Sequence, residues 1–159
     1  MKKTMMISLV LVLILSLVAC GTAPSGETPV DMDMNAVYTQ MGQTVTIPEM
    51  LTLNESLMLD YCGIRSEDVA QAVVVICADS LRTDEIWLLE AVNEDAAQKL
   101  VDLANKRLTK KGEESVTYSP AQYAVVQKAQ LLREGNYIAL IVSPDSEAMA
   151  QVFLKAAGK

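Results

Sequence analysis

The sequence AVVVICA at residues 72–78 is the strongest indication of the fold. It is a continuous apolar run rich in β-branched residues, too short for an ordinary helix, and it predicts a central strand covered on both faces. The sequence EIWLLEA at residues 85–91 predicts a second strand. The intervening residues 79–84 are mostly polar and few, so a hairpin is expected to join the two strands.

A long helix is predicted after this hairpin, over residues 94–111. Asn93 is placed to cap it, Glu94 and Asp95 lie in its first turn, and Gly112 is expected to end it. A basic cluster then falls in the last turns, where positive charge complements the helix dipole. This interpretation accounts for the cluster without a binding patch. Its members are Lys106, Arg107, Lys110 and Lys111.

The C-terminal third repeats this alternation of elements. Ser119-Pro120-Ala121-Gln122 is a capping box with proline at the first helical position, and it predicts a short helix to about Gln127. Two apolar runs, 129–133 and 137–142, flank Glu134-Gly135-Asn136, which predicts a second hairpin. The motif Ser143-Pro144-Asp145 is expected to start the last helix in the same way.

Residues 34–63 predict two short helices separated by an extended edge segment. The first has Asp33 as its cap and Gly42 as its stop, and the segment 43–50 alternates before it meets Pro48. The second covers residues 55–62, between a capping Asn54 and a left-handed Gly63.

Residues 54–111 and 119–157 both have the order helix, strand, strand, helix. The fold class is therefore predicted as α+β, with a four-stranded, mostly antiparallel sheet and helices packed on one face. The repeated order raises the hypothesis of a duplicated αββα unit. A single domain is expected over residues 34–159.

The N-terminus has the layout of a secretory signal. Lys2 and Lys3 precede an apolar stretch over residues 5–19, shorter than the roughly 20 residues that span a bilayer. Leu17-Val18-Ala19-Cys20 resembles the lipobox of bacterial lipoproteins. The resemblance implies that residues 1–19 are a lipoprotein signal peptide, that the thiol of Cys20 is lipidated, with palmitate among its acyl groups, and that residues 20–33 are a flexible tether. The alternative is an uncleaved anchor helix in which Cys20 is incidental.

Lipidation implies a cell-membrane location on the extracytoplasmic face, with the membrane as the partner of the lipid on Cys20. Residues 20–159 carry 11 basic and 20 acidic residues, a net charge of −9, which argues against a nucleic-acid partner. Histidine is absent from the chain, which removes Ser/His and Cys/His pairs and histidine-ligated metals. We therefore expect no catalytic residues, no cofactor and no metal site. The repeat at residues 31–34, DMDM, has no further ligands nearby.

Cys62 and Cys77 are the remaining cysteines. Export permits a disulfide between them, but Cys77 lies near the end of the apolar run 72–78, where a buried free thiol is common. Two buried thiols are the favoured interpretation and a bridge is the alternative.

The chain resembles a family of small lipoproteins, mostly from Gram-positive anaerobes, that carry a domain of unknown function. The matching motifs are short and cover residues from about 55 to 157. They are Tyr61-Cys62-Gly63-Ile64, Asp84-Glu85-Ile86, Lys106-Arg107-Leu108, Tyr118-Ser119-Pro120 and Gly135-Asn136-Tyr137-Ile138. The resemblance implies the anchor, the compartment and the fold, and it brings no catalytic residues.

Three functions remain to be weighed. The first is a protein-interaction or scaffold module of the cell envelope, with another envelope protein as its partner. The second is a small-ligand-binding accessory lipoprotein of a transporter or sensor, although typical solute receptors use two larger lobes. The third, an enzyme built from carboxylates alone, is not expected, because the acidic pairs Asp84/Glu85, Glu94/Asp95 and Glu113/Glu114 have capping or solvation roles.

Overall fold

Two β-hairpins form the centre of the structure, a computed structural model that describes residues 31–159. The first hairpin pairs β2 (Val69–Cys77) with β3 (Glu85–Ala91), and the second pairs β4 (Gln130–Glu134) with β5 (Tyr137–Val142). Both hairpins were predicted and are confirmed. The helices are α2 (Met34–Thr44), α3 (Glu55–Cys62), α4 (Glu94–Tyr118), α5 (Pro120–Gln127) and α6 (Ser146–Ala156), with a short 3₁₀ turn η1 (Ser66–Asp68).

The sheet has five antiparallel strands in the order β1-β2-β3-β5-β4, not the four expected. The additional strand is β1 (Met50–Thr52), a three-residue edge strand that pairs with the end of β2. The predicted edge segment 43–50 overlaps it only at Met50, since α2 continues to Thr44. So short a strand has too few residues to show an alternating pattern.

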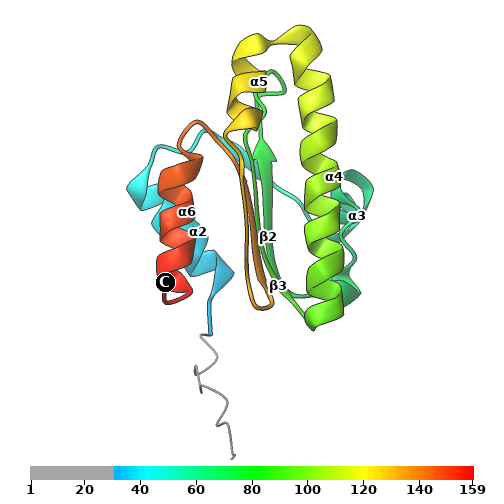
Figure 1. The fold of residues 1–159 in the computed structure, drawn as a ribbon, viewed down its shortest axis with the longest axis vertical. Coiled ribbons are helices and arrows are strands. Elements are labelled where there is room, and N and C mark those ends of the chain that lie inside the picture. Colours follow the sequence, from blue (N-terminus) through cyan, green and yellow to red (C-terminus); the bar gives the residue numbers. More distant parts are fainter. Residues whose placement is uncertain (1–30) are drawn as a thin grey trace, which may run out of the picture.

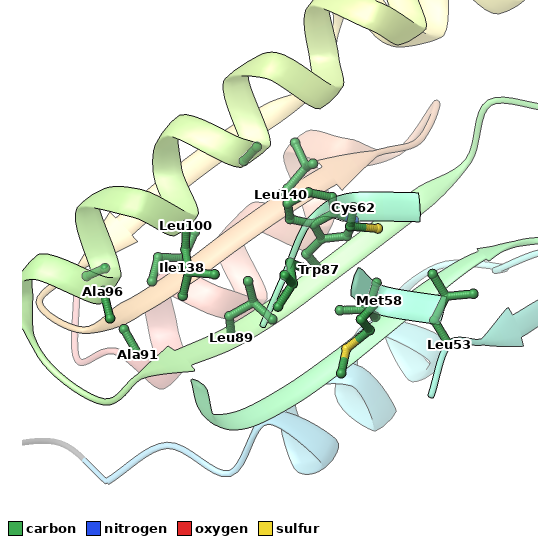
Figure 2. Packing of buried hydrophobic residues seen from close by; sticks show 14 of the residues in the cluster. Leu53, Met58, Cys62, Trp87, Leu89, Ala91, Ala96, Leu100, Ile138 and Leu140 are labelled. Carbon is green, nitrogen blue, oxygen red and sulfur yellow. The ribbon is translucent and has the colours of Figure 1, made fainter. Parts of the chain in front are cut away.

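Helices cover both faces of the sheet, which corrects the expectation of one covered face. Helices α2 and α6 lie on one side, and α3 and α4 lie on the other (Figure 1). Alternate residues of the central strands enter two separate cores: Trp87 and Leu89 of β3 face α4, whereas Ile86 and Leu88 face α2 and α6. Figure 2 shows the first of these cores, in which Leu100 of α4 packs over Leu89 and Ile138.

The described residues do not support a simple duplication. The order helix, strand, strand, helix does occur twice, and β3 pairs antiparallel with β5 at the centre of the sheet. A two-fold axis relating these antiparallel strands would stand perpendicular to the sheet, and it would keep α4 and α6 on the same face. They lie on opposite faces (Figure 1), so the two units are not related by such a rotation.

Most helices start where their predicted capping residues stand, but three predicted helix boundaries are wrong: the ends of α2 and α4 and the start of α6. Asn54 accepts from the Leu57 N–H, and Gly63 ends α3 with φ of 73°, as predicted. Helix α4 passes through Gly112, however, and continues to Tyr118, just as α2 passes through Gly42. One glycine within a helix costs only about 1 kcal/mol, which packing offsets.

The third boundary is the start of α6. The helix begins at Ser146, and Ser143-Pro144-Asp145 forms the turn before it, where the Ser143 hydroxyl accepts from the Asp145 N–H. Asp145 is the N-cap residue of α6, but its side chain accepts no capping hydrogen bond, so the motif starts the helix without the predicted cap.

The predicted signal peptide, the lipobox with Cys20, and most of the predicted tether lie outside the described residues. Residues 31–33 are described, and Met32 is buried, with its N–H donating to the Tyr137 hydroxyl. The folded unit therefore includes residue 32. Within residues 31–159, no helix has both the length and the apolar character needed to cross a membrane.

Candidate functional site: a buried charge cluster beside an apolar groove

Glu85 is the most deeply buried charged residue in the described chain, with no exposed surface. It is the first residue of β3, and its side chain points toward α4 because it alternates in step with Trp87 and Leu89. A buried carboxylate is stable only when charge and hydrogen bonds compensate it.

Two cations from α4 surround this carboxylate. Arg107 Nε lies 2.9 Å from Oε1 and 3.1 Å from Oε2, and its Nη2 lies 2.8 Å from Oε2. Lys111 Nζ lies 2.9 Å from Oε2. The two cations are four residues apart, so they lie on the same side of the helix. Trp87 completes the cluster by donating from Nε1 to Oε1 at 2.7 Å.

The cluster keeps Glu85 ionised. Burial by itself raises the pKa of this carboxyl, but the hydrogen bond and charge of Arg107 together with the charge of Lys111 offset burial and leave the pKa below its ordinary value of 4.5. Both carboxylate oxygens accept hydrogen bonds, and the ionised Glu85 has no proton to donate. Such a group clamps α4 to the sheet.

The cluster continues into a polar link that reaches α5. Lys111 Nζ also donates to the Thr83 carbonyl at 3.0 Å. The Thr83 N–H and hydroxyl in turn donate to Gln122 Oε1, at 2.9 and 3.1 Å. Gln122 belongs to the predicted capping box, but its side chain bonds the 79–84 loop. Strand, loop, α4 and α5 are thus joined by one chain of hydrogen bonds.

Both described cysteines are unpaired and buried, which agrees with the favoured interpretation. Cys62 lies in the core between α3, α4 and the sheet (Figure 2). Burial raises the pKa of its thiol to about 12, and the negative charge of Glu85 acts in the same direction. The thiol is therefore protonated at neutral pH and a poor nucleophile.

An open groove lies between α4 and α5, next to the cluster, with a volume of about 520 Å³. Its floor is apolar, and its rim includes the exposed side chains of Thr109, Glu113 and Val116. The lining residues are Leu108, Thr109, Gly112, Glu113, Val116, Tyr123, Val126, Gln127 and Ala129.

The groove lies at the end of the molecule far from the start of the described chain. In Figure 1 the α4–α5 connection stands at one end of the long axis, beyond the strand ends, and the chain enters α2 near the other end. Further apolar side chains are exposed at the groove end: Val116 and Tyr118 are 54% and 56% exposed, and Leu81, in the loop bonded to α5, is 73% exposed. We call this end of the molecule the distal end.

The three acidic pairs weighed in the sequence have different surroundings in the structure. Asp84 pairs with Arg82 at 3.0 Å, whereas its neighbour Glu85 enters the charge cluster, a role that differs from solvation. Glu94 and Asp95 occupy the first turn of α4 as predicted. Glu113 and Glu114 lie within α4 and not in a loop.

The basic cluster proved to be mid-helix, so its assignment to the C-terminal dipole was wrong. Arg107 and Lys111 turn inward to Glu85. Two features of the sequence indicate this arrangement: the two cations are four residues apart on one helix, and the buried strand before that helix begins with an acidic residue. Trp87 is fully buried and does not line the groove. Among residues 31–159, no group of three or more cysteine or acidic side chains is placed to hold a metal ion.

The chain belongs to a family defined by a domain of unknown function, DUF4358, which matches residues 43–143. The match spans the whole sheet together with α3, α4 and α5. It agrees with the expected resemblance to a domain of unknown function. No curated protein and no solved structure matches the chain.

Proposed function

We propose that this chain is an extracytoplasmic lipoprotein, held at the cell membrane by lipid on Cys20, whose folded domain is a protein-interaction module of the cell envelope and not an enzyme. The anchor is supported by the lipobox-like Leu17-Val18-Ala19-Cys20 after the apolar stretch 5–19. Two or more acyl chains give stable membrane attachment, because each buried methylene contributes about 0.8 kcal/mol.

The observation that carries the interaction module is the exposed apolar surface at the distal end. Exposed apolar surface with a polar rim often marks a protein-interaction site. Here the α4–α5 groove lies with the exposed side chains of Leu81, Val116 and Tyr118 at the end opposite the start of the described chain. Leu51 of β1 and three side chains of α3 are exposed as well, but the groove has no part in that second set.

The non-enzymatic part of the proposal is supported by the state of the buried ionisable groups. Glu85 is fully engaged by Arg107, Lys111 and Trp87, and the pKa of Cys62 is raised to about 12. Neither group has the poised pKa that proton transfer or nucleophilic attack requires.

The test is fractionation of cells that express the full chain or its Cys20→Ala variant, with labelled palmitate. We expect the wild type to be labelled and retained in membranes, and Cys20→Ala to lose the label and the retention. A Ser25→Ala variant is the matched control, since it changes the tether and keeps the thiol. Equal labelling and retention of Cys20→Ala would overturn the anchor.

A further inference from the structure

We propose that the α4–α5 groove binds an amphipathic helix of a neighbouring envelope protein, whose apolar side chains enter the groove and whose Lys or Arg pairs with Glu113. The inference deepens the proposed interaction module and rests on it. It adds the site, the shape of the partner segment and the sign of its charge.

The groove has the form that accepts a helix. Its α4 wall is built from residues 108, 112 and 116 with 109 and 113 beside them, which are adjacent ridges about two turns long. Its α5 wall is built from Tyr123, Val126 and Gln127. Two neighbouring helices with small or apolar residues between them leave a trough into which a third helix packs with side chains at i, i+3, i+4 and i+7. Gly112 has no side chain, and the Tyr123 ring of α5 lies 3.9 Å from where its Cβ would stand, so the glycine lets α5 lie close to α4.

The open rim favours a segment over a small molecule. Small-molecule sites usually bury most of the ligand surface. In this groove Thr109, Val116 and Gln127 are exposed along the rim, so a small ligand would stay largely in water.

Glu113 sets the charge of the partner. It is the single charged residue among those that line the groove, it is exposed, and no cation of residues 31–159 lies within ion-pair distance of it. Its neighbour Glu114 already pairs with Lys110 at 3.8 Å. The net charge of −9 on residues 20–159 also favours encounter with a basic segment.

The charge of the groove, and not its position, argues against the membrane as its occupant. Eleven residues, 20–30, connect Cys20 to the described chain and span at most about 40 Å when fully extended. Helix α4 alone, with 25 residues, is about 37 Å long. An extended tether is therefore long enough for the domain to turn its distal end toward the bilayer, although the two ends are opposite in Figure 1. The net charge of −9 on residues 20–159 and the exposed Glu113 in the groove argue against an anionic lipid surface as the occupant.

The experiment places a photoreactive amino acid at Val116 in the full-length chain in living cells, and maps the crosslinked peptide by mass spectrometry. Val116 is 54% exposed, so the replacement does not enter the core. A second probe at Thr109 tests the other part of the rim, and a probe at Gln151, exposed on α6 across the sheet, is the negative control.

We expect both groove probes, and not the control, to yield one protein adduct within a helical segment that carries a Lys or Arg. Glu113→Lys should lower the yield roughly threefold to tenfold, because an attraction at the rim becomes a repulsion. Glu114→Lys makes the same charge change outside the groove and should leave the yield unchanged. Replacing the basic residue of the partner by Glu should restore the adduct with the Glu113→Lys variant. Protease resistance of each variant confirms that it is folded.

Four results would overturn the inference: an adduct to lipid, an adduct to a second copy of this chain, no groove adduct from folded protein, or equal effects of the Glu113 and Glu114 changes. The anchor is tested separately by Cys20→Ala. Loss of the anchor with a specific groove adduct would contradict the proposed location alone, and retention of the anchor without an adduct would contradict the groove alone.

Discussion

Glu85→Gln tests the charge cluster, because it removes the negative charge and keeps the shape of the side chain. In the wild type, four N–H donors share the two carboxylate oxygens: Trp87 Nε1, Arg107 Nε and Nη2, and Lys111 Nζ. A glutamine offers one oxygen, which accepts about two of them, and its amide group turns further N–H donors toward the cations. Arg107 and Lys111 would then share a nearly dry site without a counter-charge.

The expected cost follows from these contacts. Each buried donor left without an acceptor costs about 1–3 kcal/mol, and breaking a buried ion pair from one side costs about 3–5 kcal/mol. Domains of this size have unfolding free energies of roughly 5–15 kcal/mol. Glu85→Gln should therefore lower the free energy of unfolding by about 3–5 kcal/mol, and the urea midpoint by about 2 M for a slope near 2 kcal/mol/M.

The assay is urea unfolding of the protein lacking residues 1–20, followed by Trp87 fluorescence and by far-UV circular dichroism. Both probes are needed because Trp87 bonds to the altered residue. Glu90→Gln is the matched control on the same strand: its carboxylate accepts from the neutral Gln71 amide at 2.7 Å, so a loss of no more than about 1 kcal/mol is expected. Equal losses for the two variants would refute the assignment of Glu85 as the buried counter-charge.

Three further outcomes are expected. The pKa of folded Glu85 lies below 4.5, so the contribution of its charge to stability is complete above about pH 4.5 and is lost as the pH falls through the folded pKa. In urea titrations at acid pH, the wild type should therefore lose more stability than Glu85→Gln. Parallel dependence of the two proteins on pH would contradict this. Gly135 has φ of 60° with open space around it, so Gly135→Val should lower the free energy of unfolding by about 1–2 kcal/mol through backbone strain alone. Asn136 has an ordinary φ, so Asn136→Ala should lower it by less than about 0.5 kcal/mol in the same denaturation assay. Iodoacetamide at pH 8 should modify Cys62 and Cys77 slowly in the native protein and rapidly in urea, and fast native labelling would show that the thiols are not buried.

The features that were predicted correctly depend on residues close together in the sequence. Helix α3 has its cap at Asn54 and its left-handed stop at Gly63, and the second hairpin turns at Gly135, because each of these residues relieves a local backbone constraint. The strands at residues 72–78 and 85–91 are apolar enough to be recognised without knowing their partners. The unbroken apolar character of the first run also implied two covered faces, and it was the better guide to the layers than the expectation of helices on one face.

The charge cluster was missed because its members are brought together by packing. Glu85 stands next to Asp84, and adjacent acids usually indicate a solvated pair, yet alternation in a strand turns one of two neighbours inward. Its partner Arg107 is 22 residues away on another element. The sequence also placed the end of the helix at Gly112, and that error assigned Lys111 to a terminal turn where a charge needs no buried partner.

The position of the cluster explains why α4 can extend beyond the sheet. Glu85 begins β3 and pairs with Val142, the last residue of β5, so the sheet ends at this level. Beyond it, α4 has no strands to cover and packs instead on α5, through apolar side chains that include Leu108 and Val126. The ion pairs of Arg107 and Lys111, and the link through Thr83 to Gln122, add directional bonds to this packing. Because residues 107, 111 and 115 turn toward the sheet side, the adjacent ridge at 108, 112 and 116 is left to line the groove. The same interactions that fix the projecting helices therefore leave an apolar surface exposed at the distal end.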